Sequence, residues 1–124
     1  LIRCTGRQGS TLPMHIHHGD DETIYMLEGA ATVDLVDQQI SVTPGDCILI
    51  ARGTAHRVTI QTPQATFLMI YVPARFEGFF RDLSEPAQYL KLPTAPAAPP
   101  DMIGLRSLAA MYGCEVLSQF PDDK

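Results

Sequence analysis

The stretch MHIHHGDDETIYMLEG, residues 14–29, places three histidines and a run of acidic residues between apolar flanks. In an extended chain, the side chains of His15 and His17 leave the same face, with their Cα atoms about 6.5–7 Å apart. Two imidazoles at that spacing can converge on one ion. The turn at residues 18–21 could fold the next strand back as an antiparallel neighbour and bring the Glu22 carboxylate beside them. By itself, the stretch is therefore compatible with two interpretations, a charge-dense solvated turn or part of a metal site carried by neighbouring strands.

The other polar residues of this stretch have different expected roles. His18 points to the opposite face of the extended segment, so we exclude it from the predicted ligands. Asp20 and Asp21 are expected to form a solvated turn. His56 follows a second turn, at residues 52–55, and begins another strand. Because a barrel closes its strands around one interior, it could bring His56 to the other predicted ligands.

The overall composition excludes several classes of function. The chain has 124 residues, 45% of them hydrophobic, and a formal net charge of -5, which is typical of one globular domain. The acidic balance leaves no basic surface for a phosphate backbone, so no nucleic-acid partner is expected. Apolar runs such as residues 47–51 are too short to cross a bilayer, so no membrane association is expected. The three widely spaced cysteines predict no disulfide framework and favour a cytoplasmic location.

Residues 1–73 have the pattern of a series of short strands. Apolar runs rich in β-branched residues are separated by turn signals, such as EGA at 28–30 and TPGD at 43–46, about every eight to ten residues. This spacing is typical of an all-β sandwich or barrel rather than of alternating strands and helices. The segment TFLMIYV, residues 66–72, is apolar on both faces, as expected of a strand covered on both sides. We therefore predict an all-β fold for this part of the chain.

The pattern changes to a helical one after Pro73. Glu77 and Arg81 are four residues apart, in the orientation that favours an ion pair on a helix. The apolar side chains of this segment recur with the spacing of one helical face, at Phe76, Phe79, Phe80 and Leu83. The segment therefore predicts a short amphipathic helix.

Residues 74–124 are expected to form a helical extension that packs on the barrel as part of the same domain. The segment PTAPAAPP, residues 93–100, predicts an extended connector of the polyproline type. A second helix is expected to follow, with Asp101 as its N-cap and an end near Gly113. The predicted buried edge of this helix consists of Met102, Leu105, Ala109 and Tyr112.

The spacing of the histidines and glycines resembles that of the cupin superfamily. The first cupin motif has the form G-x5-H-x-H-x3,4-E-x6-G. The chain satisfies each of these spacings, at Gly9, His15, His17, Glu22 and Gly29. The resemblance implies a single cupin β-barrel of the jelly-roll type, a double-stranded β-helix, over residues 1–73.

The second cupin motif, G-x5-P-x-G-x2-H-x3-N, is matched in part. Gly45, Gly53 and His56 take their expected positions. Ala51 stands where proline is usual, and Ile60 stands where asparagine is usual. Neither departure falls on a ligand position. The metal ligands that the resemblance implies are His15, His17, Glu22 and His56.

The ligand set limits the choice of metal. Three neutral imidazoles and one carboxylate leave a net charge of +1 on a divalent ion, with one or two coordination positions open. This set suits a divalent transition metal, either Fe, Mn, Ni, Co, Cu or Zn, and it disfavours ions that require only oxygen ligands. A closed structural zinc site is disfavoured because such sites typically contain cysteine.

Strand alternation predicts an apolar wall around the ion. Residues two and four positions after Glu22 share its face of the strand, and the same holds after His56. The wall predicted in this way consists of Ile24, Met26, Val58 and Ile60. Such a wall shapes a pocket for a small, largely apolar substrate.

Two segments are similar to the small bacterial quercetinase-like branch of the cupins. They are the sequence around Glu22, within residues 14–29, and FEGFF at residues 76–80. The resemblance implies a quercetin 2,3-dioxygenase-like oxidoreductase that acts on a flavonol or a similar enolisable aromatic molecule. The substrate hydroxyl would bind the metal and lose its proton to Glu22, and the activated substrate would react with O2, with ring cleavage and release of CO. Glu22 would then be both a metal ligand and the general base.

Several alternatives remain open at this point. Phe76, Phe79 and Phe80 could close over the pocket as a lid, or they could simply pack the helix against the barrel. A metal-dependent isomerase or another small-molecule enzyme would use the same kind of site, and so would a cupin that binds a metal or small ligand without turnover. A regulator is disfavoured because no helix-turn-helix segment is visible. The resemblance also implies a homodimer, since most cupins of this size pair.

Overall fold

The computed structural model describes residues 1–93 and 101–117. The elements, in chain order, are β1 (Ile2–Arg7), β2 (His15–His17), β3 (Asp21–Glu28), β4 (Ala31–Asp34), β5 (Gln39–Val42), β6 (Cys47–Ile50), β7 (Arg57–Ile60), β8 (Gln64–Val72), α1 (Glu77–Leu83), α2 (Met102–Met111) and β9 (Cys114–Val116). The predicted all-β fold with helices near the C-terminus is confirmed. The predicted connector lies outside the described residues, apart from its first residue.

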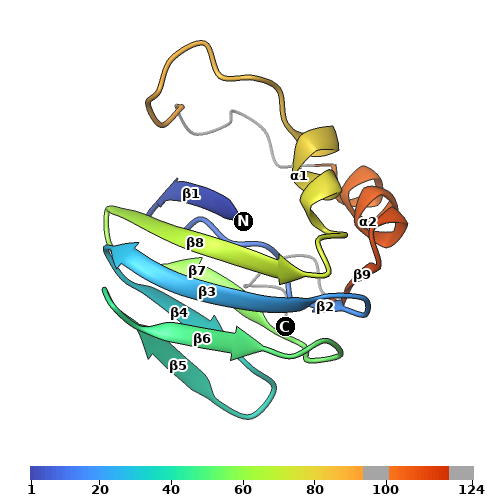
Figure 1. Cartoon of the computed structure of the whole chain (residues 1–124), viewed down its shortest axis with the longest axis horizontal. Coiled ribbons are helices and arrows are strands. Elements are labelled where there is room, and N and C mark those ends of the chain that lie inside the picture. The colour runs from blue at the N-terminus through green and yellow to red at the C-terminus, as the bar shows by residue number, and fades with distance from the viewer. Residues whose placement is uncertain (94–100, 118–124) are drawn as a thin grey trace.

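Two sheets lie face to face and enclose the core (Figure 1). The larger sheet has the strand order β1-β8-β3-β6 and the smaller has β5-β4-β7, with all neighbours antiparallel. Alternation directs one face of each strand inward, so Ile24 and Met26 of β3 and Val33 of β4 are fully buried. The core therefore forms between the sheets.

Strand β8 is buried along most of its length. Its inward residues Phe67, Met69 and Tyr71 belong to the core. Cover on its outer face is less complete than the sequence predicts, because Val72 is exposed and Ile70 is half-buried. The apolar sequence of residues 66–72 therefore predicts more burial of the outer face of β8 than the structure shows.

The turn between β3 and β4 depends on Gly29. Its φ of 76° lies in the left-handed region, which favours glycine. A Cβ atom at this position would lie 2.3 Å from the backbone oxygen of Gln64. The glycine therefore permits the turn to approach the start of β8 closely.

Strand β2 pairs differently from the expected hairpin with β3. It lies antiparallel to β9, with His15 opposite Val116 and His17 opposite Cys114. Strand β3 pairs instead with β6 and β8. The hypothesis that an antiparallel β2–β3 neighbour brings Glu22 to the histidines is therefore wrong, because the β2 edge is taken by a strand from the far end of the described chain.

Helix α1 packs at the same end of the molecule as β2, α2 and β9 (Figure 1). Phe79 is buried, and Glu77 and Arg81 form the predicted ion pair. Leu83 was expected on the buried face but is 51% exposed, because it is the last residue of the helix. The predicted amphipathic helix is otherwise confirmed.

Helix α2 begins and ends near the predicted positions. The Asp101 side chain accepts a hydrogen bond from the backbone N–H of Ile103, which satisfies one of the unpaired donors at the helix start. Gly113, just beyond the helix end, has a φ of 75°. Ala109 is buried on the predicted edge. The other members of that edge, Met102, Leu105 and Tyr112, are half-buried.

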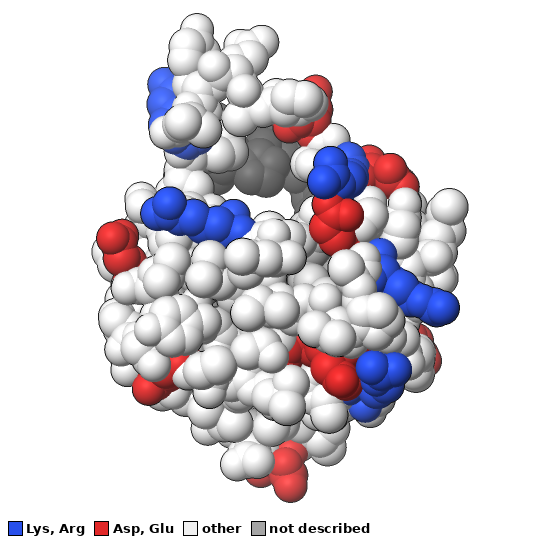
Figure 2. All heavy atoms as spheres, viewed as in Figure 1, with Lys and Arg blue, Asp and Glu red and all other residues white. Residues whose placement is uncertain are grey.

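The surface gives two further facts. On the face seen in Figure 2, the described Lys and Arg side chains are scattered among acidic ones rather than gathered in one patch. Neither described helix combines the length and apolarity that would let it span a membrane.

Candidate metal centre

The structure brings the four predicted ligands together in the interior. Their candidate ligand atoms all lie within 4.8 Å of one another, and the ring centroids of the three histidines are 4.4–5.4 Å apart. Ligands bound to one ion at about 2.1 Å are at most about 4.2 Å apart. Small side-chain movements would therefore place all four on a single ion. The members of this cluster are at most 5% exposed: His15, His17, Glu22 and His56.

Backbone hydrogen bonds hold the histidine-bearing segments to each other. His15 and His56 exchange two of them, each with an N–O distance of 3.0 Å. The N–H of Gly53 donates to the carbonyl of His17 at 2.8 Å, and its φ of 83° again favours glycine. Because β9 holds the other edge of β2, the histidines are fixed from both sides.

Two of the histidines have their tautomers set by backbone carbonyls. The Nδ1–H of His15 donates to the carbonyl of Pro13 at 2.7 Å, and that of His56 donates to the carbonyl of Thr54 at 2.9 Å. Since a carbonyl only accepts, Nδ1 carries the proton in both rings. Each ring can therefore present its Nε2 atom to a metal, and metal-bound histidines usually have such a partner on the other nitrogen.

The contacts of Glu22 fit a cation in the centre of the cluster. Its Oε2 lies 2.9 Å from His56 Nε2 and 3.3 Å from His17 Nε2. The Nε2 atom of His56 lies within hydrogen-bond distance of this oxygen, and a metal bound between the two atoms would take the place of the shared proton. The His17 contact lacks hydrogen-bond geometry, and neither ring nitrogen of this buried residue has a hydrogen-bond partner within the described part of the chain. Buried polar atoms are rarely left unpaired, so a metal ligand role suits His17.

Burial and neighbouring groups shift the pKa of two members of the cluster, His15 and Glu22. Burial of the ring, together with the proximity of His56, lowers the pKa of His15 to about 4. Burial raises the pKa of Glu22, but the contacts with His17 and His56 outweigh it and hold the pKa below its usual range. Near neutral pH, His15 is therefore neutral and Glu22 ionised, as metal binding needs.

The donor set matches a transition metal. Three imidazole nitrogens and one carboxylate oxygen suit Fe, Mn, Ni, Co, Cu or Zn. The described cluster includes no cysteine, which distinguishes it from most closed structural zinc sites. These observations support a metal-binding site and leave the identity of the metal open.

Tyr71 belongs to the site although the sequence analysis did not select it. Its hydroxyl donates a hydrogen bond to Glu22 Oε1 at 3.0 Å, and its side chain is buried. Burial and the charge of Glu22 raise the pKa of Tyr71 above its usual range, so it remains a donor. Alternation along residues 66–72 predicts that the Tyr71 side chain points inward. It does not predict which strand pairs with this one and so which residue Tyr71 contacts.

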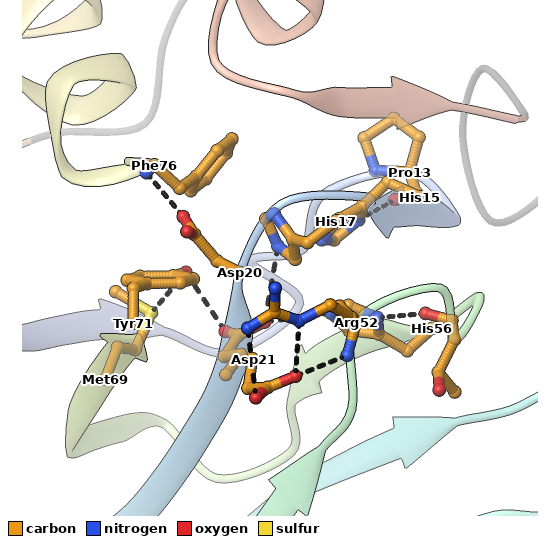
Figure 3. Close-up of polar contacts among 12 residues, drawn as sticks. Pro13, His15, His17, Asp20, Asp21, Arg52, His56, Met69, Tyr71 and Phe76 are labelled. Carbon is orange, nitrogen blue, oxygen red and sulfur yellow. Dashed lines mark hydrogen bonds and ion pairs between the residues drawn. The ribbon is translucent and has the colours of Figure 1, made fainter. Parts of the chain in front are cut away.

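The remaining polar residues of the opening stretch divide in an unexpected way. His18 is exposed and contacts Glu115 at 2.9 Å, as expected of a residue outside the cluster. Asp21 forms an exposed ion pair with Arg52. Asp20, however, is 2% exposed and accepts a hydrogen bond from the backbone N–H of Phe76 at 2.7 Å. The prediction of a solvated Asp20 is therefore wrong, because its carboxylate ties the turn to the start of α1 (Figure 3).

A cavity of about 320 Å³ adjoins the cluster. His15, Glu22 and His56 line it, whereas His17 does not. Most of the other lining is apolar, and no Lys, Arg or Asp is found among the described residues that form it. The cavity can therefore hold a small, largely uncharged molecule next to the cluster.

The predicted pocket residues divide into two groups. Those that line the cavity are Ile24, Val58, Ile60, Phe79 and Phe80. Met26 and Phe76 are not among the lining residues. Met26 lies further along β3 and is fully buried, and Phe76 packs edge-on against His17, with their ring centroids 4.3 Å apart. The cavity lining therefore does not include these two residues, and Phe76 instead contacts a predicted ligand.

Comparison with known proteins places this site in a family. A model of the cupin domain matches residues 4–72, which is more than half of the chain. The quercetin 2,3-dioxygenase of Bacillus subtilis (strain 168) is 31% identical over 98 residues, or 79% of this chain. The chain spans only 29% of the length of that relative.

Solved structures of similar proteins have the same fold. A sugar phosphate isomerase of the cupin superfamily from Silicibacter pomeroyi matches with a TM-score of 0.52 and 26% identity, over 56% of this chain and 46% of that one. A predicted oxalate decarboxylase from Thermotoga maritima matches with a TM-score of 0.52 and 23% identity, over 56% and 61%. The predicted cupin jelly roll is thus confirmed. Because the cupin model covers most of the region that forms the two sheets, the chain belongs to the cupin family.

Proposed function

We propose that this chain is a metal-dependent dioxygenase that acts on a flavonol-like or other enolisable aromatic molecule. The observation that carries the proposal is the position of the buried His15, His17, Glu22 and His56 cluster beside an apolar cavity. The 31% identity to a quercetin 2,3-dioxygenase over most of this chain supports the choice of reaction.

The lining of the cavity supports an uncharged substrate. A phosphate or second carboxylate that lies in the cavity away from the metal would need a cationic side chain, because a desolvated charge without a partner is costly. None of the described lining residues is Lys or Arg. Aromatic and aliphatic side chains, among them Ile60, Phe79 and Phe80, instead offer contacts to flat rings. These features favour a flavonol over the alternative of a phosphorylated sugar for an isomerase.

The cluster, Glu22 and the apolar cavity wall would each have a separate role in the reaction. A transition metal held by the cluster would supply Lewis acidity toward a substrate hydroxyl and, if redox-active, chemistry with O2. Glu22, the carboxylate that lines the cavity, would accept the hydroxyl proton as general base. The apolar wall would orient the rings and exclude water from the reacting atoms.

Oxygen consumption tests this proposal directly. The protein is loaded with Fe, Mn, Ni or Co in turn and mixed with a panel of small flavonols. We expect O2 uptake coupled to CO release, and no uptake with a flavone that lacks the hydroxyl. Glu22→Gln should lower turnover by about 100-fold or more, whereas His18→Gln, a change of an exposed histidine outside the cluster, should not.

Two results would contradict the proposal. An absence of O2 uptake with every metal and flavonol would exclude the dioxygenase function and, if metal still binds, would favour a non-catalytic binding protein. Undiminished turnover in Glu22→Gln would exclude Glu22 as the base.

A further inference from the structure

The two carboxylate oxygens of Glu22 have different partners. Oε2 faces the histidines, at 2.9 Å from His56 Nε2 and 3.3 Å from His17 Nε2. Oε1 accepts the hydrogen bond from the Tyr71 hydroxyl at 3.0 Å. One oxygen therefore faces the histidines, and the other faces the Tyr71 hydroxyl.

The sheet and the surrounding rings fix the hydroxyl of Tyr71 in place. Tyr71 is the direct cross-strand partner of Glu22 in the β3–β8 pairing, so the two side chains leave the same face as neighbours. Its ring packs against His17 and Phe76, each with a centroid distance of 5.4 Å, and against Phe80 at 6.3 Å. The side chain is 6% exposed. Within this packing the hydroxyl reaches two acceptors, Glu22 Oε1 at 3.0 Å and Met69 Sδ at 3.6 Å, and the ionised carboxylate is the stronger of the two.

We propose that Tyr71 is a positioning residue that holds Glu22 as a one-oxygen ligand. The inference rests on the proposed metal site and extends it. With Oε1 engaged by Tyr71, Glu22 would bind a metal through one oxygen only, which would leave room for a substrate on the cavity side. A tyrosine that served only to fill the core would not affect the metal.

The test is a Co²⁺ titration of the wild type and Tyr71→Phe, followed by visible absorption. Phenylalanine keeps the ring packing and removes only the hydroxyl. We expect a 10- to 100-fold weaker affinity, the usual effect of removing a partner that orients a metal ligand. The Co²⁺ bands should also lose intensity, because a released carboxylate can bind through both oxygens and raise the coordination number. Tyr25→Phe is the matched control, since Tyr25 is 37% exposed on the outer face of β3, and it should behave as the wild type.

A double-mutant cycle separates positioning from a general effect on the fold. In a Glu22→Ala background, Tyr71→Phe should cause no further loss of Co²⁺ affinity, because its target is gone. If the losses of Co²⁺ affinity from Tyr71→Phe and Glu22→Ala add in full, Tyr71 has a structural role and the inference is overturned. This criterion also applies when Tyr71→Phe lowers the stability of the fold.

The inference and the proposed function can fail separately. Equal affinities and equal spectra for the wild type and Tyr71→Phe would overturn the inference and leave the metal site intact. A wild type that binds no Co²⁺ would overturn the metal-dependent function and this inference with it. A wild type that binds Co²⁺ but consumes no O2 with any metal would overturn the dioxygenase alone.

Discussion

At the scale of single residues, the histidines of the cluster differ in what supports them. The Nδ1 of His15 and that of His56 each donate to a backbone carbonyl, whereas His17 has no hydrogen-bond partner within the described residues. A buried polar group without a partner costs free energy in the metal-free protein. We infer that His17 is kept for binding a metal at some cost to the stability of the fold.

Substitution of His17 by leucine should separate stability from metal binding. In the metal-free protein, His17→Leu should leave the free energy of unfolding unchanged or raise it by about 1 kcal/mol, because an unpaired polar group is removed. His15→Leu should lower it by about 1–3 kcal/mol, since the Pro13 carbonyl loses its donor. Both variants should bind Ni²⁺ far more weakly than the wild type. Urea denaturation and Ni²⁺ titration measure these effects, and an equal loss of stability in both would contradict the interpretation.

Asp20 provides a second prediction at this scale. Its buried carboxylate accepts from the N–H groups of Phe76, at 2.7 Å, and Arg75, at 3.4 Å. Asp20→Ala should lower the free energy of unfolding by about 1–3 kcal/mol, because the buried N–H of Phe76 loses its partner. Asp21→Ala is the neighbouring control and should cost less, since its pair with Arg52 is exposed. A larger effect of Asp21→Ala in chemical denaturation would show that the assignment of the two roles is wrong.

At the scale of elements, β9 carries no predicted ligand but determines the position of β2. The register places Glu115 opposite Ile16, between the hydrogen bonds from His18 N to Gly113 O and from Leu117 N to Met14 O. A residue in that place contributes its own N–H to the ladder. Strand β9 is therefore part of the support of the metal site.

A proline in β9 tests this support. Glu115→Pro removes the backbone donor and should weaken Co²⁺ affinity by at least about 10-fold, because the backbone of His15 and His17 loses its partner strand. Glu115→Ala removes only the exposed contact with His18 and should leave the affinity unchanged. Similar affinities for the two variants would indicate that β2 keeps its position without β9.

Helix α1 contributes to both packing and the cavity. Phe79 is 1% exposed and stacks on Phe76 at a centroid distance of 4.6 Å, whereas Phe80 is only half-buried. Phe79→Ala should cost about 3–5 kcal/mol of stability, as expected for a buried ring. Phe80→Ala should cost less and should mainly raise the KM for a flavonol, because Phe80 lines the cavity. Thermal unfolding and steady-state kinetics distinguish the two, and an unchanged KM in Phe80→Ala would exclude contact with the substrate.

At the scale of the whole molecule, the proposed metal site joins three segments of the chain that carry ligands, at residues 15–17, 22 and 56, and β9 supports the first of them. A ligand that binds only the folded state stabilises it by mass action, by about 2.7 kcal/mol at a concentration of 100 times its Kd. Saturating Ni²⁺ should therefore raise the Tm, and EDTA should reverse the shift. His56→Ala should show a much smaller rise, and an equal rise in this variant would mean that the metal binds elsewhere.

Much of the fold and the cluster could be predicted from local patterns. The spacing of His15 and His17 follows from the two-residue period of a strand, and the inward position of Ile24 follows from Glu22 in the same way. The N-cap Asp101 and the ion pair of α1 depend on neighbours within one helical turn. In each case the interacting groups lie a few residues apart, so the regular geometry of a single strand or helix determines their relative positions.

By itself, then, the sequence determined the all-β class and the cupin motif, together with the faces on which the predicted ligands lie. Only the tertiary structure decided that β9 pairs with β2, that Tyr71 lies opposite Glu22 and that Asp20 is buried against the residue before α1. The physical reason is that alternation specifies the face of a strand but not the strand beside it. Partners far apart in the chain are chosen by how the whole core packs, and the environment of the metal site depends on those partners.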